Sequence, residues 1–199
     1  SMSGTFEHIH VPPTLISFAL APAKASRLIS NVLKGGEKVW RLPVPKDGQY
    51  VPDFEKLKAL YREVYKNIAN GNITFATVAE NGGAGAAVVK SALGNGVGFG
   101  FVQSADELYT ECYGDLLVSL QDETAFSAEI EKEYIGIAND SGKFTCGGES
   151  VSMEEAVNAY LSPLESVFAT TAPASGKAEN CDFYAEKKYG NIGVKAAKP

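Results

Sequence analysis

The chain has 199 residues, of which 45% are hydrophobic and 21% charged, and its formal net charge is −6. This length and composition are typical of one folded domain with a buried core. The acidic balance lacks the dense basic surface that non-specific nucleic-acid binding needs, and it gives no attraction to an anionic membrane surface. The sequence has no run of about 18 apolar residues, so no transmembrane helix is predicted.

The cysteines indicate the compartment. The chain has an odd number of cysteines, and no CxxC pair occurs; the three are Cys112, Cys146 and Cys181. Neither a disulfide framework nor a zinc knuckle is therefore predicted, and a reducing cytoplasmic setting is the simplest interpretation. The N-terminus lacks the plan of a signal peptide. Ser1-Met2 resembles a scar left by tag cleavage, so we expect the chain to begin inside a longer protein.

The first forty residues predict two strands and a helix. The apolar run at residues 14–20 is bounded by prolines and predicts a buried strand. Pro22 suits the first position of a helix, and the spacing of apolar residues predicts that helix over residues 23–33. The alternating pattern of residues 38–42 predicts a second strand.

The clearest helical pattern begins after Asp53, a favoured N-cap residue. From Phe54 to Ile68, apolar residues recur at steps of three and four, which predicts one apolar stripe on a helix. A third strand is predicted over residues 73–78. It leads into Asn81-Gly82-Gly83, and a helix is then expected to run to about Leu93.

The second half of the chain alternates short strands and helices. The predicted elements are a strand at 97–102, a helix at 106–112, a strand at 115–120, a helix at 124–132, a strand at 134–138, a hairpin arm at 143–146 closed by Gly147-Gly148, a helix from the capping box at Ser152 to about Tyr160, and a further helix from Pro163 to about Phe168. Several strand pairs lack long helices between them. This order favours an α+β layout with helices packed on a mixed, largely antiparallel sheet.

Asn81-Gly82-Gly83 is a candidate anion site. Free N–H groups and the helix dipole at a strand-to-helix junction favour an anion, and glycines let a phosphate approach the backbone. The stretch matches neither the Walker nor the Rossmann pattern. A tight turn explains the glycines at least as well, so the residues alone leave both interpretations open.

The signals for other functional residues are weaker. His8 and His10 form an H-x-H pair that could grip a metal, but no third ligand is near, and a solvated segment is the preferred interpretation. Asp115 is either a functional carboxylate or a turn residue before a strand. The body of the chain has no histidine and no G-x-S-x-G motif. We therefore predict no catalytic residue and no metal site.

Five blocks of the sequence, taken in order, resemble phosphoribosylformylglycinamidine synthase in its long single-chain form, in which synthetase and glutaminase are fused. The blocks are VPPTLISFAL (11–20), GGAGAAVVKSALGNGVGFGF (82–101), YGDLLVSL (113–120), YIGIANDSGKFTCGGESVSMEEAVNAYLSPLESVF (134–168) and NCDFYAEKKYGNIGVKAAKP (180–199). The resemblance covers nearly the whole chain after about Thr5. The last two blocks are the specific ones, whereas the glycine-rich block alone indicates the wider aminoimidazole-ribonucleotide-synthetase superfamily.

The resemblance implies a domain plan. Residues 1–10 would be a cloning scar and lead-in, residues 11–168 the second C-terminal-type domain of the synthetase core, and residues 169–199 an extended linker toward a glutaminase domain. The family fold is a three-layer α/β/α sandwich with a mixed sheet. The family converts formylglycinamide ribonucleotide, ATP and glutamine into the amidine, ADP, phosphate and glutamate.

In that family the nucleotide and magnesium sites and the glutaminase cysteine lie largely outside this stretch. The resemblance therefore implies a domain that scaffolds the synthetase core in the cytoplasm, with ATP and magnesium as cofactors of the parent enzyme. Its partners would be the other domains of the same polypeptide and a ribonucleotide substrate. We expect the isolated fragment to be inactive.

The resemblance also bears on the glycine-rich junction. In the superfamily this junction helps to bind substrate phosphate, often within an Ala-His-Asp-x-x-Asp-Gly-Gly motif. Here Thr77, Val78 and Asn81 stand for the histidine and the two aspartates, so the charges are lost. Asn81, Gly82, Gly83 and Gly85 are still predicted to hold a phosphate through their N–H groups. The alternative function is thus a small-anion or nucleotide-phosphate binding module.

Overall fold

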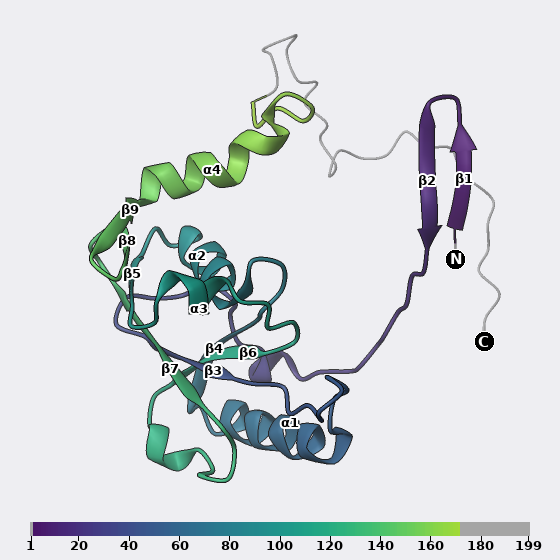
Figure 1. Ribbon diagram of the computed structural model, residues 1–199. Coiled ribbons are helices and arrows are strands. Elements are labelled where there is room, and N and C mark those ends of the chain that lie inside the picture. Colours follow the sequence, from purple (N-terminus) through teal and green to yellow (C-terminus); the bar gives the residue numbers. More distant parts are fainter. Residues whose placement is uncertain (1, 172–199) are drawn as a thin grey trace, which may run out of the picture. The chain divides into compact units, whose positions relative to one another are not determined.

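The computed structural model describes residues 2–171 (Figure 1). Strand β1 (Met2–Phe6) and strand β2 (Ile9–Thr14) form an antiparallel hairpin in which Phe6 pairs with Ile9 and Met2 with Thr14. The described residues divide at Tyr160. The sheet and the site below lie in the unit that precedes this boundary.

A seven-stranded mixed sheet is the centre of the fold. Its strand order is β4-β6-β3-β7-β5-β8-β9, and every neighbouring pair is antiparallel except β5 and β8. The strands are β3 (Lys38–Leu42), β4 (Ile73–Val78), β5 (Gly98–Phe101), β6 (Leu116–Leu120), β7 (Glu133–Asn139), β8 (Lys143–Cys146) and β9 (Glu149–Ser152). The predicted mixed, largely antiparallel sheet is confirmed.

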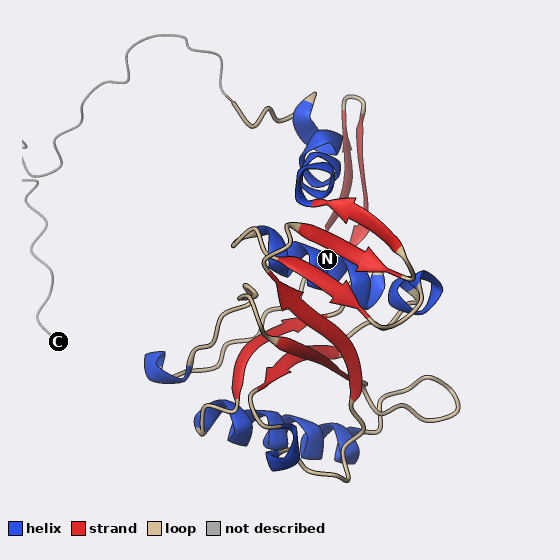
Figure 2. Ribbon diagram, turned by 90° about the vertical axis from the view of Figure 1, so that its left-hand side faces the viewer, coloured by secondary structure: helices blue, strands red, loops and turns tan. Residues whose placement is uncertain are grey.

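Helices cover both faces of this sheet. Helix α1 (Phe54–Ala69) lies on one face, and helices α2 (Gly83–Leu93) and α3 (Ala105–Tyr109) lie on the other (Figures 1 and 2). Helix α4 (Met153–Glu165) follows β9 directly. The arrangement is the three-layer α/β/α sandwich that the sequence resemblance implies.

Two apolar cores follow from the alternation of side chains along each strand. In β3, Val39 packs into the core beneath α2, whereas Leu42 packs into the core beneath α1. In β6, Leu117 and Val118 divide in the same way. The sheet is therefore buried on both faces near its centre, which fixes the register of these strands.

Side-chain caps fix the ends of several helices where the sequence predicts them. The Asp53 carboxylate accepts a hydrogen bond from the Lys56 N–H at 3.1 Å and begins α1. At the start of α4, the Ser152 hydroxyl accepts from the Glu155 N–H at 3.2 Å, and the Glu155 carboxylate accepts from the Ser152 N–H at 2.8 Å. This reciprocal pair is the predicted capping box.

The prediction of a buried strand at residues 14–20 is wrong. Strand β2 ends at Thr14, and the side chains of Leu15, Phe18 and Leu20 are 85%, 91% and 100% exposed. The reason is that no described strand lies beside this segment: its ladder ends where Met2 pairs with Thr14. Strand-forming residues without a neighbouring strand gain neither hydrogen bonds nor burial.

The predicted helix at residues 23–33 is also wrong, because only Ala25–Arg27 forms a short 3-10 turn. The rest is held extended by tertiary contacts. Ser30 makes a parallel bridge to Phe75 of β4, and its carbonyl accepts from the Ala76 N–H at 3.1 Å. The Leu33 N–H donates to the Ser91 carbonyl at 3.0 Å. Pairing with the edge of the sheet outweighs the local helical pattern.

Two further helix predictions need correction. Residues 124–132 form only the 3-10 turn Glu123–Ala125, because Phe126 is buried and the Ser127 N–H donates to the Glu63 carboxylate at 3.1 Å. Pro163 does not begin a separate helix but lies within α4. It is close to the end of that helix, so its missing N–H costs little.

Candidate functional site

The junction between β4 and α2 forms where the sequence predicts it. Gly82 is the N-cap residue of α2 with φ 91°, and Gly83 follows with φ 67°. The Gly83 N–H donates to the Glu80 carbonyl at 3.0 Å. Both glycines therefore adopt left-handed backbone conformations that side chains disfavour, as a tight turn requires.

Close packing is a second reason why residues 83 and 85 are glycines. A Cβ on Gly83 would lie 2.6 Å from the carbonyl oxygen of Leu108 and 2.7 Å from that of Thr110. A Cβ on Gly85 would lie 3.2 Å from Cβ of Leu108. The start of α2 is thus pressed against the end of α3, and carbonyl oxygens rather than open space face Gly83.

The free N–H groups at the start of α2 are partly occupied. The Gly83 N–H is taken up by the Glu80 carbonyl, and the nearby Cys112 thiol is buried, which raises its pKa. Of the four predicted phosphate-binding residues, Asn81 is exposed, Gly82 is half-buried, and Gly83 and Gly85 are buried. Their role in holding an anion stays a prediction.

A polar pocket of about 500 Å³ lies on another side of this junction. Asn81 lines it together with Thr77 and Val78 at the end of β4. The other lining residues are Asn31, Val32, Glu80, Ala87, Lys90, Ser91, Gly94 and Tyr160. The glycines at the start of α2 are not among them, so the pocket and the glycine turn are separate features.

The polar side chains of the pocket have no partners among residues 2–171. Within that part of the chain, none of them makes a side-chain hydrogen bond or an ion pair: Asn31, Thr77, Glu80, Asn81, Lys90, Ser91 and Tyr160. Lys90 brings a cation and Glu80 an anion, while the amides and hydroxyls can both donate and accept. The arrangement can bind a small polar ligand.

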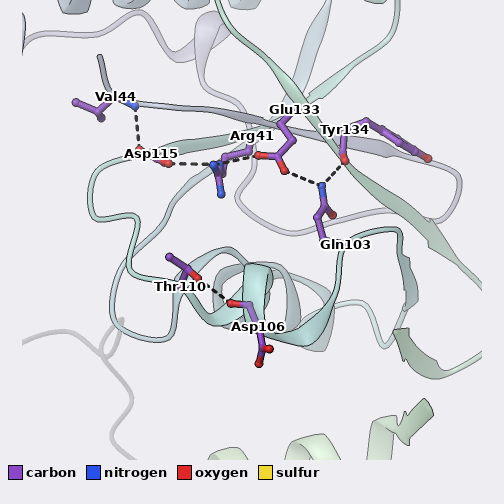
Figure 3. Close-up of polar contacts among 8 residues, drawn as sticks. All are labelled: Arg41, Val44, Gln103, Asp106, Thr110, Asp115, Glu133 and Tyr134. Carbon is purple, nitrogen blue, oxygen red and sulfur yellow. Dashed lines mark hydrogen bonds and ion pairs between the residues drawn. The ribbon is translucent and has the colours of Figure 1, made fainter. Parts of the chain in front are cut away.

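A second cluster of charges lies at the neighbouring ends of β3 and β7, on the face that α3 covers (Figure 3). Arg41 of β3 places Nε 3.4 Å from the Asp115 carboxylate and Nη2 3.0 Å from the Glu133 carboxylate. Gln103 donates to the Glu133 carboxylate at 3.2 Å and to the Tyr134 carbonyl. One cation is thus held between two carboxylates, so its positive charge is already paired and is not available to an anionic ligand.

Asp115 anchors this cluster to the backbone. It is only 5% exposed, and its carboxylate accepts from the Val44 N–H at 2.9 Å. Burial raises the pKa of this carboxyl group, and the Val44 hydrogen bond and Arg41 oppose that rise. The Asp115 carbonyl also accepts from the Ala79 N–H at 2.8 Å. The cluster therefore holds the loop between β4 and α2 in place.

Asp106 of α3 and Thr110, the C-cap residue of that helix, do not join the cluster drawn in Figure 3. The Thr110 hydroxyl donates instead to the Asp106 carbonyl at 2.7 Å. Gln103 Oε1 and Trp40 Nε1 are buried without a hydrogen-bond partner among the described residues. Arg41 Nε has its ion-pair partner but no well-aligned hydrogen bond.

Sequence reasoning missed most of this geometry. It left Asp115 open between a functional carboxylate and a turn residue, and it did not single out Arg41, Glu133 or Lys90. An arginine within an alternating strand beside a buried sheet was the available signal for Arg41. Lys90 carries no signal in sequence, because an exposed helical lysine is ordinary.

The remaining candidates are placed as follows. His10 lies on β2 and contacts the Thr5 hydroxyl at 3.1 Å, and His8 lies in the hairpin turn. No group of three metal-ligating side chains occurs within residues 2–171. Cys112 and Cys146 are free thiols, and Cys181 lies outside the described residues. In the described chain no helix is long and apolar enough to cross a membrane.

No protein-family model matches the chain, and no curated protein sequence matches it. Solved structures do share its architecture, a mixed-sheet α/β/α sandwich. Three examples come from Thermotoga maritima. They are PurL complexed with AMPPCP, phosphoribosylformylglycinamidine synthase II, and PurL complexed with FGAR.

The likeness to these proteins is one of fold. PurL with AMPPCP superposes with a TM-score of 0.55 at 12% identity, over 67% of this chain and 28% of its own. The synthase II structure gives 0.50 at 12% identity over 65% and 27%, and PurL with FGAR gives 0.51 at 9% over 66% and 30%. The fold that the sequence blocks implied is confirmed. The chain spans less than a third of the length of these relatives.

Proposed function

We propose that this chain is the second C-terminal-type domain of a single-chain phosphoribosylformylglycinamidine synthase, followed by the linker toward a glutaminase domain. One observation carries the proposal: the described sandwich superposes on part of PurL with a TM-score of 0.55. The five sequence blocks that resemble the same enzyme in order agree with it.

Within that enzyme the domain scaffolds the synthetase core and performs no chemistry itself. Thr77, Val78 and Asn81 replace the charged residues of the superfamily motif, which removes the groups that could move protons or bind magnesium. ATP, magnesium and glutamine are used at other parts of the parent polypeptide. The parent converts formylglycinamide ribonucleotide to the amidine in the cytoplasm, and this domain's partners are its neighbours in the same chain.

A genetic test addresses membership of the purine pathway. Disruption of the gene that encodes this chain should make the organism dependent on added purine and should cause formylglycinamide ribonucleotide to accumulate. The intact gene should restore growth. Unchanged growth without purine, with no accumulation of this intermediate, would refute the proposal.

A biochemical test addresses the scaffold role. The purified chain is incubated with formylglycinamide ribonucleotide, ATP, magnesium and either glutamine or ammonia, and ADP release is followed. We expect no turnover above background. Amidine formation by the isolated chain would show that the domain is itself catalytic.

A second candidate function rests on the polar pocket beside the β4–α2 junction. Its polar side chains have no partners among the described residues, and Lys90 provides a positive charge. Such a pocket suits a small phosphate-bearing ligand, with Lys90 attracting the anion and Asn31 and Asn81 binding its hydroxyl groups. This candidate corresponds to the alternative binding module, with the anion held by the side chains of the pocket rather than by the glycine-rich turn.

Calorimetric titration with ribose 5-phosphate, and separately with ADP–magnesium, tests this candidate. Lys90→Ala should abolish binding, whereas Lys143→Ala, which removes an exposed lysine outside the pocket, should leave it unchanged. Gly83→Asp is unsuitable because any side chain there collides with the backbone of α3. Absence of heat with either ligand, or equal affinity in the Lys90 variant, would leave the pocket without this role.

A further inference from the structure

One apolar segment of the chain has neither a strand partner nor a buried face. Residues 15–20 make no backbone hydrogen bond to any described residue, and Phe18 and Leu20 are 91% and 100% exposed. No charged residue occurs from Val11 to Ala23. In an extended conformation, Ile16, Phe18 and Leu20 share one face. An exposed apolar segment of this composition is available for pairing with another sheet edge.

The same chain carries an apolar cavity that no described residue fills. It has a volume of about 430 Å³ and lies between α2, α3, the β8–β9 hairpin and the start of α4. Its walls are mainly apolar, and the larger lining side chains are Val89, Phe101, Leu108, Tyr109, Phe144, Val151 and Tyr160. β9 borders the cavity and is the last strand of the sheet, so within residues 2–171 no strand pairs with its outer side.

The segment and the cavity fit one another chemically. An extended peptide that runs along an edge strand can place alternate side chains in an adjoining pocket, which is a common mode of recognition between proteins. Ile16, Phe18 and Leu20 would supply those side chains. The cavity lining carries one carboxylate, Glu149, and one ammonium group, Lys90, so its charges balance, which suits a segment that has no charge of its own.

We propose that residues 15–20 of one copy of this chain dock into the β9–α4 cavity of a second copy. Every copy carries both the segment and the cavity, so the exchange is reciprocal and closes as a two-fold dimer. Pairing of two segments with each other is less favourable, because an isolated two-stranded ribbon leaves its apolar face in water. This inference does not depend on the proposed function.

Sedimentation velocity of the whole chain over a range of concentrations tests the exchange. The wild type should dimerise. Phe18→Asp, which alters the segment, and Val151→Asp, which alters the cavity, should each raise the dimer dissociation constant by about 100-fold or more. Val51→Asp is the matched control, since Val51 is 46% exposed and Val151 48%, and Val51 lies outside the cavity. It should dimerise like the wild type.

Mixing the two defective variants gives the decisive result. A Phe18→Asp chain keeps a working cavity and a Val151→Asp chain keeps a working segment, so the mixture should form a one-to-one dimer that neither variant forms alone. A monomeric wild type, or a mixture that stays monomeric, would overturn the proposal. Dimers of Val151→Asp alone would instead show segment-to-segment pairing and would equally overturn it. Circular dichroism confirms that each variant is folded.

Discussion

The carboxylate of Asp115 accepts a hydrogen bond from the backbone N–H of Val44 at 2.9 Å, and this bond joins the residue before β6 to the loop after β3. The same carboxylate pairs with Arg41 across the sheet. The pKa of Asp115 is nevertheless raised, because burial outweighs both contacts. A raised pKa in the folded state has a definite consequence for stability.

The folded state holds the Asp115 proton more tightly than the unfolded state, whose aspartate pKa is about 3.9. The stabilisation from this group is therefore fully present below about pH 3.9 and is lost as pH rises through the raised folded pKa. Asp115→Asn cannot titrate. As the pH rises from about 3.9 through the folded-state pKa of Asp115, the wild type loses this stabilisation and the variant does not. The free energy of unfolding of the variant, minus that of the wild type, should therefore increase with pH. Urea unfolding at a series of pH values measures the difference, and a difference that is constant or falls with pH would contradict the assignment.

Gly83→Ala should destabilise the chain by about 2–4 kcal/mol, because the added Cβ collides with two backbone carbonyls as well as requiring a left-handed conformation. Gly96→Ala is the matched control. Gly96 has φ 64°, close to the 67° of Gly83, but nothing lies within 4 Å of its added Cβ. It should cost only about 1 kcal/mol. Chemical denaturation measures both, and equal losses would mean that packing against α3 does not matter.

Phe75→Ala and Phe18→Ala delete the same side chain in opposite environments. Phe75 is fully buried and its loss should cost about 3–5 kcal/mol. Phe18 is 91% exposed, so its loss should change the stability of the monomer by less than about 0.5 kcal/mol. The free energies of unfolding are compared in dilute solution, where copies do not associate. A large loss for Phe18 in the monomer would mean that residues 14–20 are buried after all.

Asp53→Ala should cost about 1 kcal/mol, because it leaves the Lys56 N–H at the start of α1 without its capping partner. Asp53→Asn should be nearly neutral, since an asparagine oxygen caps as well as a carboxylate. Thermal unfolding followed by circular dichroism distinguishes the two variants. If both destabilised the chain equally, the negative charge rather than the cap would be the important feature.

The sequence predicts best where local signals and tertiary contacts agree. Asp53 and the apolar stripe of α1 need no distant partner to be recognised, and the strand at residues 38–42 has the same bounds in the structure. The glycines of the β4–α2 junction likewise mark a real turn. In each case interactions between residues close in sequence are enough to determine the local structure.

The failures share a different cause. Residues 23–33 have helical spacing, but Ser30 is held extended against β4, which lies more than forty residues later in the sequence. The polar pocket was missed for the same reason. It combines Asn31 with Asn81 and Lys90, which lie far from Asn31 in the sequence and come together with it only in the folded chain. The sequence carries no local trace of such contacts, so neither the extended segment nor the pocket could be predicted from it.

The position of β3 in the sheet bears on how the protein acquires its structure during synthesis. Val39 pairs with Ser119 of β6 on one side and with Gly136 of β7 on the other. Strand β3 is therefore the first strand of this sheet to be synthesised, and both of its neighbours are synthesised much later. Closing such long loops is slow and leaves an apolar strand unpaired meanwhile. A ribosome-bound chain that stops before β7 should therefore be a strong chaperone substrate, and the sheet should form only after Asn139 has emerged.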